Sequence, residues 1–355
     1  MTAAVRSRRI VANGRPRRRG WIAVLVGVMA VALLVPAAAF AEPDPAHEAA
    51  SPKVAALRAN LEAAAVGYVQ AQAALESSRE RRAALDTEVR TADGRLAEAR
   101  ARVAKYAAQA YRTGRLGVLG LIVRATSPDG YLARLAAVEQ LAAHDDARMN
   151  ELGRARTAAL AARASVDAEV KEQARQAAEM SRRKKAMEVA LSAAGARAAE
   201  GWVDPDSPLA APARRAPDGT WPREGCTIDD PTTSGCITPR TLHALRQAQQ
   251  AGFKRYVTCH RPSGRYEHPT GRACDFATEV GRFADSSATG ASRAYGDRLA
   301  AFLVRNARRL GVIYVVFYCK IWLPGSGWQN YTSGGARCGD SPSGDHTNHV
   351  HVSVY

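Results

Sequence analysis

The stretch that decides the carboxyl-terminal fold reads Asp345-His346-Thr347-Asn348-His349-Val350-His351-Val352-Ser353-Val354. From His349 onward polar and apolar side chains alternate, which predicts a strand over residues 349–354. Successive side chains of a strand point to opposite faces, so His349 and His351 share one face and the valines share the other. His346 lies in the preceding turn, from which it can fold back toward the histidine face.

A second motif lies upstream and reads His268-Pro269-Thr270-Gly271-Arg272-Ala273-Cys274-Asp275. Gly271 permits a tight turn, after which Asp275 falls on a predicted strand over residues 273–277. Two histidines and a carboxylate with an open fourth position are the ligands of catalytic zinc. Five of the eight histidines lie between residues 259 and 351, which favours a metal site over a chance grouping. His268, Asp275 and a histidine of the final motif are the expected ligands of one divalent metal, with the remaining imidazoles left for acid–base work.

The last 131 residues, 225–355, are predicted to form a compact α+β domain. Thr238-Pro239 is a typical helix start, and the helix should run to about residue 251. A second helix over residues 295–310 should end at Gly311. Further strands are expected over residues 253–259 and over the apolar run 312–318.

All six cysteines fall in this domain: Cys226, Cys236, Cys259, Cys274, Cys319 and Cys338. An even number in one domain of an exported chain predicts three disulfides, for which fifteen connectivities exist. Pairing of sequence neighbours is favoured, 226–236, 259–274 and 319–338. A cysteine zinc site is the alternative, but the C-x2-C spacing typical of one is absent. A bond between Cys259 and Cys274 would brace Asp275.

Residues 1–41 resemble a secretory signal peptide. Seven arginines precede an apolar run from Trp21 to Leu34, and Ala39-Phe40-Ala41 is a small-x-small cleavage site. An uncleaved membrane anchor is the alternative. The chain carries a net charge of +16, of which the seven arginines contribute +7, so the mature chain has +9. A basic exported protein is attracted to an anionic surface such as a cell wall, and export argues against nucleic acid as the partner.

Two long helices are predicted over residues 53–200, after a short linker at 42–52. The first, to about residue 111, has a heptad pattern of core positions. One set of positions is Leu61, Tyr68, Leu75, Arg82, Val89, Leu96, Val103 and Ala110, and the other is Leu57, Ala64, Ala71, Ser78, Leu85, Ala92, Ala99 and Tyr106.

The second helix should run over residues 131–194, with a poorer seam at Val138, Leu152, Val166, Met180 and Met187. Glycines and a proline between the helices favour an antiparallel coiled-coil hairpin over a single rod that dimerises. The apolar segment 116–123 would form its tip, either as a small core or as a docking site for a membrane partner. Residues 201–224 contain five prolines and are predicted to be a flexible linker, which would let the domain fold back on its own stalk.

The spacing His268-x-x-Gly271-x-Ala273-x-Asp275 followed by His349-x-His351 resembles the zinc site of the LAS-type peptidases. This class comprises lysostaphin, D-alanyl-D-alanine carboxypeptidases and dipeptidases, and the hedgehog signalling domain. The ending of the chain is similar to that of penicillin-insensitive murein endopeptidases. The resemblance covers about residues 225–355, in a form similar to a C-terminal domain of exported actinobacterial proteins.

The resemblance implies zinc bound by His268, Asp275 and His351, with His349 as acid or base. It also implies an arginine that holds a substrate carboxylate or oxyanion, a place that Arg261 fits. Many members carry a Glu or Asp three residues before the last ligand, where this chain has Asn348. Asp345, His346 or His349 would then serve as the base.

The helical half resembles hairpins of exported regulators of cell-wall hydrolases at division, which dock on a membrane complex. The expected function is an exported zinc peptidase that cuts peptide bonds of peptidoglycan, with a docking or regulatory hairpin. The alternative is a non-catalytic wall- or partner-binding protein with a zinc-stabilised domain on a helical stalk. A secreted signalling or adhesion module is a third reading.

Overall fold

The computed structural model describes residues 52–113, 120, 126–193, 196–263, 266–331 and 337–355. The expected signal peptide, the linker before residue 52 and the apolar segment 116–123, apart from Gly120, lie outside these residues. Among the helices described, none is both long and apolar enough to cross a membrane.

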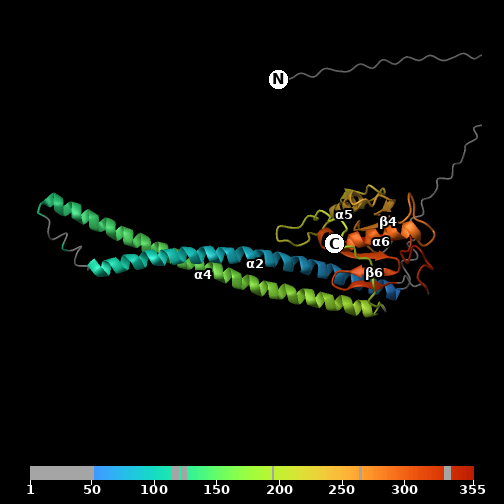
Figure 1. Cartoon of the computed structure of the whole chain (residues 1–355), viewed down its shortest axis with the longest axis horizontal. Helices are drawn as coiled ribbons and strands as arrows, with labels where there is room; N and C mark the ends of the chain where they lie inside the picture. The colour runs from blue at the N-terminus through green and yellow to red at the C-terminus, as the bar shows by residue number, and fades with distance from the viewer. Residues whose placement is uncertain (1–51, 114–119, 121–125, 194–195, 264–265, 332–336) are drawn as a thin grey trace, which may run out of the picture. The chain divides into compact units, whose positions relative to one another are not determined.

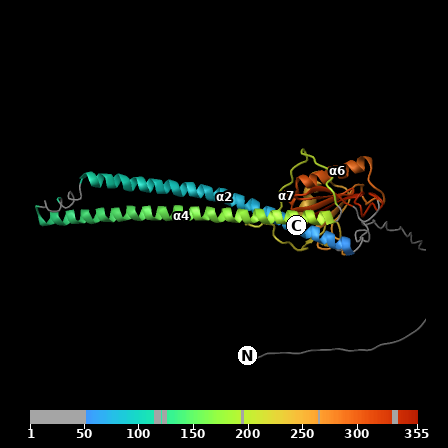
Figure 2. The same ribbon diagram turned by 90° about the horizontal axis from the view of Figure 1, so that it is seen from below.

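Two long helices precede the sheet domain, α2 over Pro52–Thr113 and α4 over Pro128–Ala193 (Figures 1 and 2). They pack antiparallel, because partners on α4 move back along the chain as those on α2 move forward. Arg81 pairs with Glu169 at 3.1 Å and Asp93 with Arg163 at 3.0 Å. Most predicted core positions of α2 are buried from Tyr68 to Ala99, but Leu85 and Val89 are half-buried and Arg82 faces solvent.

The Pro-rich segment 201–224 packs against the sheet domain, whereas the sequence predicted a flexible linker. The Trp202 ring lies 5.1 Å from that of Phe317, and Trp221 is buried. The backbone amide of Ala213 donates to the carbonyl of Arg309 at 2.7 Å. Prolines indicated only the lack of regular structure here, because this irregular segment gains its contacts from residues distant in sequence.

Six antiparallel strands form the main sheet in the order β3-β4-β8-β5-β6-β7. The predicted bounds of β4 and β8 agree with the structure, the predicted β3 is longer than observed, and the β6–β7 hairpin was not predicted. The predicted helix 295–310 begins earlier and is divided into α6 and α7. The elements are β1 Ile228–Asp229, β2 Cys236–Ile237, α5 Pro239–Gln250, β3 Val257–Thr258, β4 Ala273–Ala277, α6 Gly290–Arg305, α7 Ala307–Leu310, β5 Val312–Phe317, β6 Lys320–Leu323, β7 Gly327–Asn330 and β8 His349–Val354.

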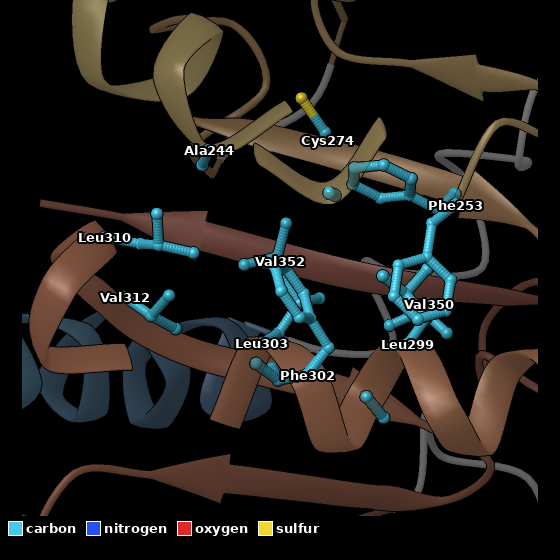
Figure 3. Close-up of a cluster of buried hydrophobic side chains, with 14 of the residues drawn as sticks. Ala244, Phe253, Cys274, Leu299, Phe302, Leu303, Leu310, Val312, Val350 and Val352 are labelled. Carbon is cyan, nitrogen blue, oxygen red and sulfur yellow. The ribbon is translucent and has the colours of Figure 1, made fainter. Parts of the chain in front are cut away.

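Helices α5, α6 and α7 cover one face of this sheet. The valines of β8 point into this core, where they meet Leu299, Phe302 and Leu303 of α6 (Figure 3). The opposite face is apolar at β5 and β6, and there the base of the two long helices packs on it. That second cluster joins Ala64, Ala65, Tyr68, Val69, Ala73, Met187, Leu191, Ala213, Trp221, Ile313, Val316, Ile321 and Leu323.

Three disulfides link Cys226 to Cys236, Cys259 to Cys274 and Cys319 to Cys338. The predicted pairing of sequence neighbours is confirmed. Disulfides persist in oxidising compartments, so this pattern is consistent with an extracellular protein.

Candidate metal centre

Strands β4 and β8 bring the two sequence motifs together. They pair with Asp275 opposite His351 and Ala277 opposite His349, so the carboxylate and both imidazoles share one face. His268 reaches this face from the turn before β4. The turn needs glycine, because Gly271 has φ of +69° and a Cβ there would lie 2.6 Å from Cys226 Sγ.

The three predicted ligands meet in a buried cluster. Asp275 Oδ2 lies 3.2 Å from His268 Nε2, and Asp275 Oδ1 lies 2.8 Å from His351 Nδ1. His268 Nε2 and His351 Nδ1 are themselves 3.2 Å apart. One ligand atom from each residue thus lies within 4.8 Å of the other two, which is close enough for one ion to contact all three.

The ring nitrogens of His268 and His351 that face away from the cluster have hydrogen-bond partners compatible with metal binding. His268 Nδ1 lies 2.5 Å from the Cys259 carbonyl, which can only accept, so Nδ1 carries a proton and Nε2 is the nitrogen that faces Asp275 and could bind a metal. His351 Nε2 lies 2.8 Å from Ser353 Oγ, a hydroxyl oxygen that can accept a hydrogen bond from Nε2–H when Nδ1 serves as a ligand. Metal-binding histidines typically donate their other N–H in this way, so the donor set fits zinc.

The Asp275 carboxylate is stabilised as an anion. Burial by itself would raise its pKa, but the charges of His268 and His349 and the hydrogen bonds from His268 and His351 hold the pKa well below its usual value. Arg261 contributes a further cation, with Nη1 at 3.4 Å from Asp275 Oδ2. Arg261 thus lies in the cluster, where it can also face negative charge on a bound substrate.

His349 and His346, the expected acid–base residues, flank the three ligands. His349 Nε2 lies 3.6 Å from Asp275 Oδ1, and the rings of His346 and His349 are 4.7 Å apart. His346 Nδ1 lies 3.0 Å from the Gly344 carbonyl, which fixes its proton there and makes Nε2 the basic nitrogen. Asp345 is differently engaged, because its Oδ2 accepts from the amides of Gly339 at 2.9 Å and Ser341 at 3.4 Å.

Three residues that the sequence analysis did not identify extend the cluster as a hydrogen-bonded chain. Ser353, next to His351 Nε2, bonds to the Tyr314 hydroxyl, which donates in turn to Glu267 Oε2. The Tyr314 ring also stacks on His351, with centroids 5.4 Å apart and planes at 11°. A single polar residue in the apolar strand 312–317 was the signal for Tyr314.

Tyr314 and Glu267, the two acidic groups of this hydrogen-bonded chain, stay protonated at neutral pH. Burial, and then Glu267, hold the pKa of Tyr314 well above its usual value. Burial, and then Glu62 of α2, raise the pKa of Glu267 to about 8. Glu62 also pairs with Arg272 at 2.9 Å, so the base of α2 reaches the turn that carries His268.

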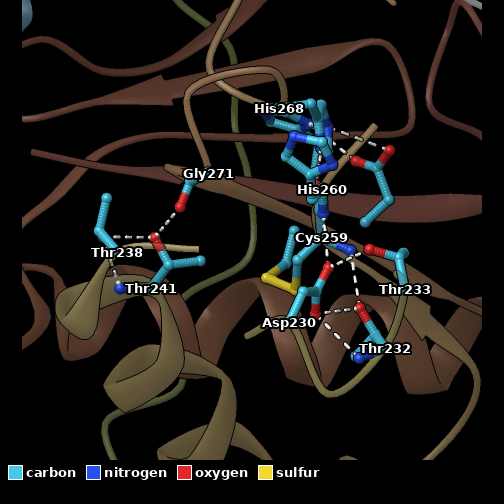
Figure 4. Close-up of a disulfide and its surroundings, with 12 residues drawn as sticks. Asp230, Thr232, Thr233, Thr238, Thr241, Cys259, His260, His268 and Gly271 are labelled. Atoms are coloured by element: carbon cyan, nitrogen blue, oxygen red, sulfur yellow. Dashed lines mark hydrogen bonds and ion pairs between the residues drawn. A yellow bond between two sulfur atoms is a disulfide. The ribbon is translucent and has the colours of Figure 1, made fainter. Parts of the chain in front are cut away.

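The loop that follows β3 is held by the segment between β1 and β2 (Figure 4). Asp230 Oδ2 accepts from the His260 amide at 2.7 Å, and Thr232 Oγ1 accepts from the Cys259 amide at 3.0 Å. These bonds fix the backbone that carries Arg261 and the carbonyl that orients His268. His260 also approaches Cys226 and Cys236, but both sulfurs are consumed in a disulfide and cannot bind a metal.

Residues 233–349 match the family described as VldE, C-terminal domain. The matched segment is less than half of the chain and contains His268, Asp275 and His349, but it ends before His351. No curated protein and no solved structure matches the chain.

Proposed function

We propose that this protein is an exported, zinc-dependent peptidase that cuts peptide bonds of peptidoglycan. The observation that carries the proposal is the meeting of His268 Nε2, Asp275 and His351 Nδ1 within one ion's reach. The acceptors behind the two imidazoles, the Cys259 carbonyl and Ser353 Oγ, support it. Residues 225–355 would then be a LAS-type peptidase domain.

Bound zinc would polarise the scissile carbonyl and acidify a water molecule. The residues of the chain have separate tasks around it. Arg261 stabilises negative charge that develops on the substrate oxygen, because its guanidinium lies beside Asp275. His349 takes the proton of the water and returns it to the leaving amine, and His346 assists at 4.7 Å between ring centroids. Asp345 acts by holding the loop that carries His346.

The proposed substrate and partners are supported by the resemblance to LAS-type peptidases and by the charge of the chain. Peptidoglycan stem peptides are the substrate class of the resembling peptidases, and a mature charge of +9 favours an anionic wall. The long helices would form a coiled-coil hairpin that docks at the membrane division complex through residues 116–123. The pair Glu62–Arg272 supports a regulatory contact within the chain between the stalk and the zinc domain.

A non-catalytic, zinc-stabilised wall- or partner-binding protein is the second candidate. Burial of the cluster favours it. His268, Asp275 and His351 are 2%, 0% and 4% exposed, and His349 is fully buried. A peptide bond must reach the ligands before it can be cut, so a cluster closed in this way suits a structural ion.

The test uses the full mature chain, residues 42–355, because the long helices cover part of the sheet and belong to its core. Metal-free protein is loaded with one equivalent of zinc and incubated with cross-linked muropeptides, and the products are identified by mass. We expect cleavage by the wild type and by the control His243→Ala, and none by His349→Gln at full zinc occupancy. Zinc binding without any cleavage would support the second candidate, and no zinc binding would contradict both.

A further inference from the structure

Asn348 stands where many resembling peptidases carry a carboxylate base, yet it is 3% exposed and fully engaged. Its Nδ2 donates to the Ala284 carbonyl at 2.6 Å, and its Oδ1 lies 2.7 Å from His349 Nδ1. Its backbone carbonyl accepts twice from Thr278, from the amide at 3.1 Å and from Oγ1 at 2.7 Å. Both ends of the residue are therefore held.

These contacts determine which way the amide faces. A backbone carbonyl can only accept, so the group next to Ala284 must be the NH₂ of Asn348. Oδ1 therefore faces His349, and an amide oxygen can only accept as well. His349 Nδ1 must then carry a proton. In a neutral imidazole this leaves the lone pair on Nε2, the nitrogen 3.6 Å from Asp275 Oδ1.

The His349 ring is also fixed in direction. Phe283 contacts it edge-on, with centroids 5.6 Å apart and planes at 77°. The pairing of His349 with Ala277 across β4 and β8 fixes its backbone. The lone pair of a neutral His349 is thus directed toward the ligand cluster, where a general base or a further metal ligand would need it.

We propose that Asn348 is a positioning residue that sets the tautomer of His349, with Nδ1 protonated and Nε2 basic. The inference rests on the proposed function for its meaning in catalysis, but the tautomer itself does not require zinc or activity. An asparagine in place of the carboxylate then does not remove the base. It moves the base to His349, because a neutral amide orients the ring without taking its proton.

The experiment reads the tautomer directly. The mature chain is prepared with ¹⁵N-labelled histidine and kept metal-free with chelator. Long-range ¹H–¹⁵N spectra are then recorded at increasing pH until the His349 ring is neutral. The signal is assigned by its loss in His349→Gln. We expect Nδ1–H for the wild type. Asn348→Asp keeps the acceptor and should keep that tautomer, whereas Asn348→Leu should lose it.

The matched control is Thr278→Val, which removes a buried hydrogen bond to the same residue at its backbone carbonyl. This variant should leave the tautomer unchanged. A wild-type ring protonated on Nε2, or an unchanged tautomer in Asn348→Leu, would overturn the inference. If Asn348→Leu does not fold, the wild type and Asn348→Asp still test the inference, because a His349 ring protonated on Nε2 in either protein would contradict it.

A second readout connects the tautomer to the reaction. In the zinc-loaded chain, Asn348→Leu should lower kcat by about 10–100-fold, with KM and zinc stoichiometry little changed. Asn348→Asp should retain more of the activity. Should the wild type bind zinc without cleaving muropeptides, the proposed function fails while the tautomer experiment still stands by itself.

Discussion

The two faces of strand β8 are equally buried and chemically opposite. Val350, Val352 and Val354 are 0%, 3% and 2% exposed on one face. His349, His351 and Ser353 on the other are 0%, 4% and 0% exposed. Burial by itself therefore does not distinguish a core from a site.

Hydrogen bonding distinguishes them. A buried polar group without a partner costs on the order of 1–3 kcal/mol, so three adjacent ones persist only if each is satisfied. His351 meets Asp275 and Ser353, and His349 meets Asn348. The valines need no such partners and gain only from apolar packing, against α6 and the rest of the core beside it. The polar face depends on a fixed set of neighbours, and the apolar face on shape.

Loss of a proposed zinc ligand should have the largest effect, and it should act on the polar face alone. In His351→Ala we expect zinc affinity to fall at least about 100-fold, beyond the 10–100-fold typical of losing a ligand's outer partner. Metal content of the purified chain, measured by mass spectrometry, checks this. His243→Ala is the control, because that histidine on α5 bonds only to the Ala211 carbonyl among the contacts described. One zinc per chain retained in His351→Ala would contradict the assigned ligand set.

The Cys259–Cys274 disulfide lies in the apolar core and also braces residues next to the polar cluster. Its removal should therefore lower both stability and zinc affinity. Its closed loop of 15 residues predicts a loss of about 3 kcal/mol in unfolding free energy. Zinc affinity should also fall, because Cys259 orients His268 and Cys274 precedes Asp275. Denaturant unfolding and zinc titration of the double serine variant measure these effects.

The Cys319–Cys338 pair provides the matched comparison for that variant. Its loop of 19 residues predicts a similar loss of stability, but it holds a loop that carries no zinc ligand. Equal zinc affinity in the two double serine variants would show that the Cys259–Cys274 bond has no special effect on the site.

A cavity on the apolar face should lower the free energy of unfolding and leave zinc binding unchanged. Leu299 is fully buried on α6, and Leu299→Ala should cost about 3 kcal/mol of unfolding free energy. Zinc stoichiometry should stay at the wild-type value, because no polar contact of the cluster involves this side chain. Loss of zinc at a temperature where the variant remains folded would mean that the two faces are coupled through the strand.

The sequence predicted the apolar face well and the polar face in part. The alternation of polar and apolar residues predicted both ends of β8. The two histidine-containing motifs led to the expectation that Asp275 and His351 lie together. Glu267, Tyr314 and Ser353 were missed, because their roles depend on cross-strand neighbours that no local pattern encodes. Asn348 was recognised only as a departure, since its meaning depends on the carbonyl of Ala284, 64 residues away. The packed course of residues 201–224 was missed for the same reason.

The smallest effect is expected from Ser353→Ala, which removes the acceptor behind His351 while leaving every ligand in place. The Tyr314 hydroxyl loses a donor at the same time, although its own bond to Glu267 remains. Stability of the metal-free chain should fall by about 1 kcal/mol, the usual net contribution of one hydrogen bond. Zinc affinity should fall about tenfold, because His351 Nε2–H no longer has its acceptor and the Nδ1 tautomer that excludes metal becomes more populated.

Competition with a chromophoric chelator measures that affinity. Ser207→Ala is the control. It also removes a buried hydroxyl, which donates to Asp204 Oδ2 at 2.9 Å, but this hydrogen bond is not part of the cluster. A tenfold weakening confined to Ser353→Ala would show that the polar face of β8 works through paired neighbours. Equal zinc affinity in both serine variants would mean that the three ligands alone determine binding, and that the chain from Ser353 to Glu267 serves packing.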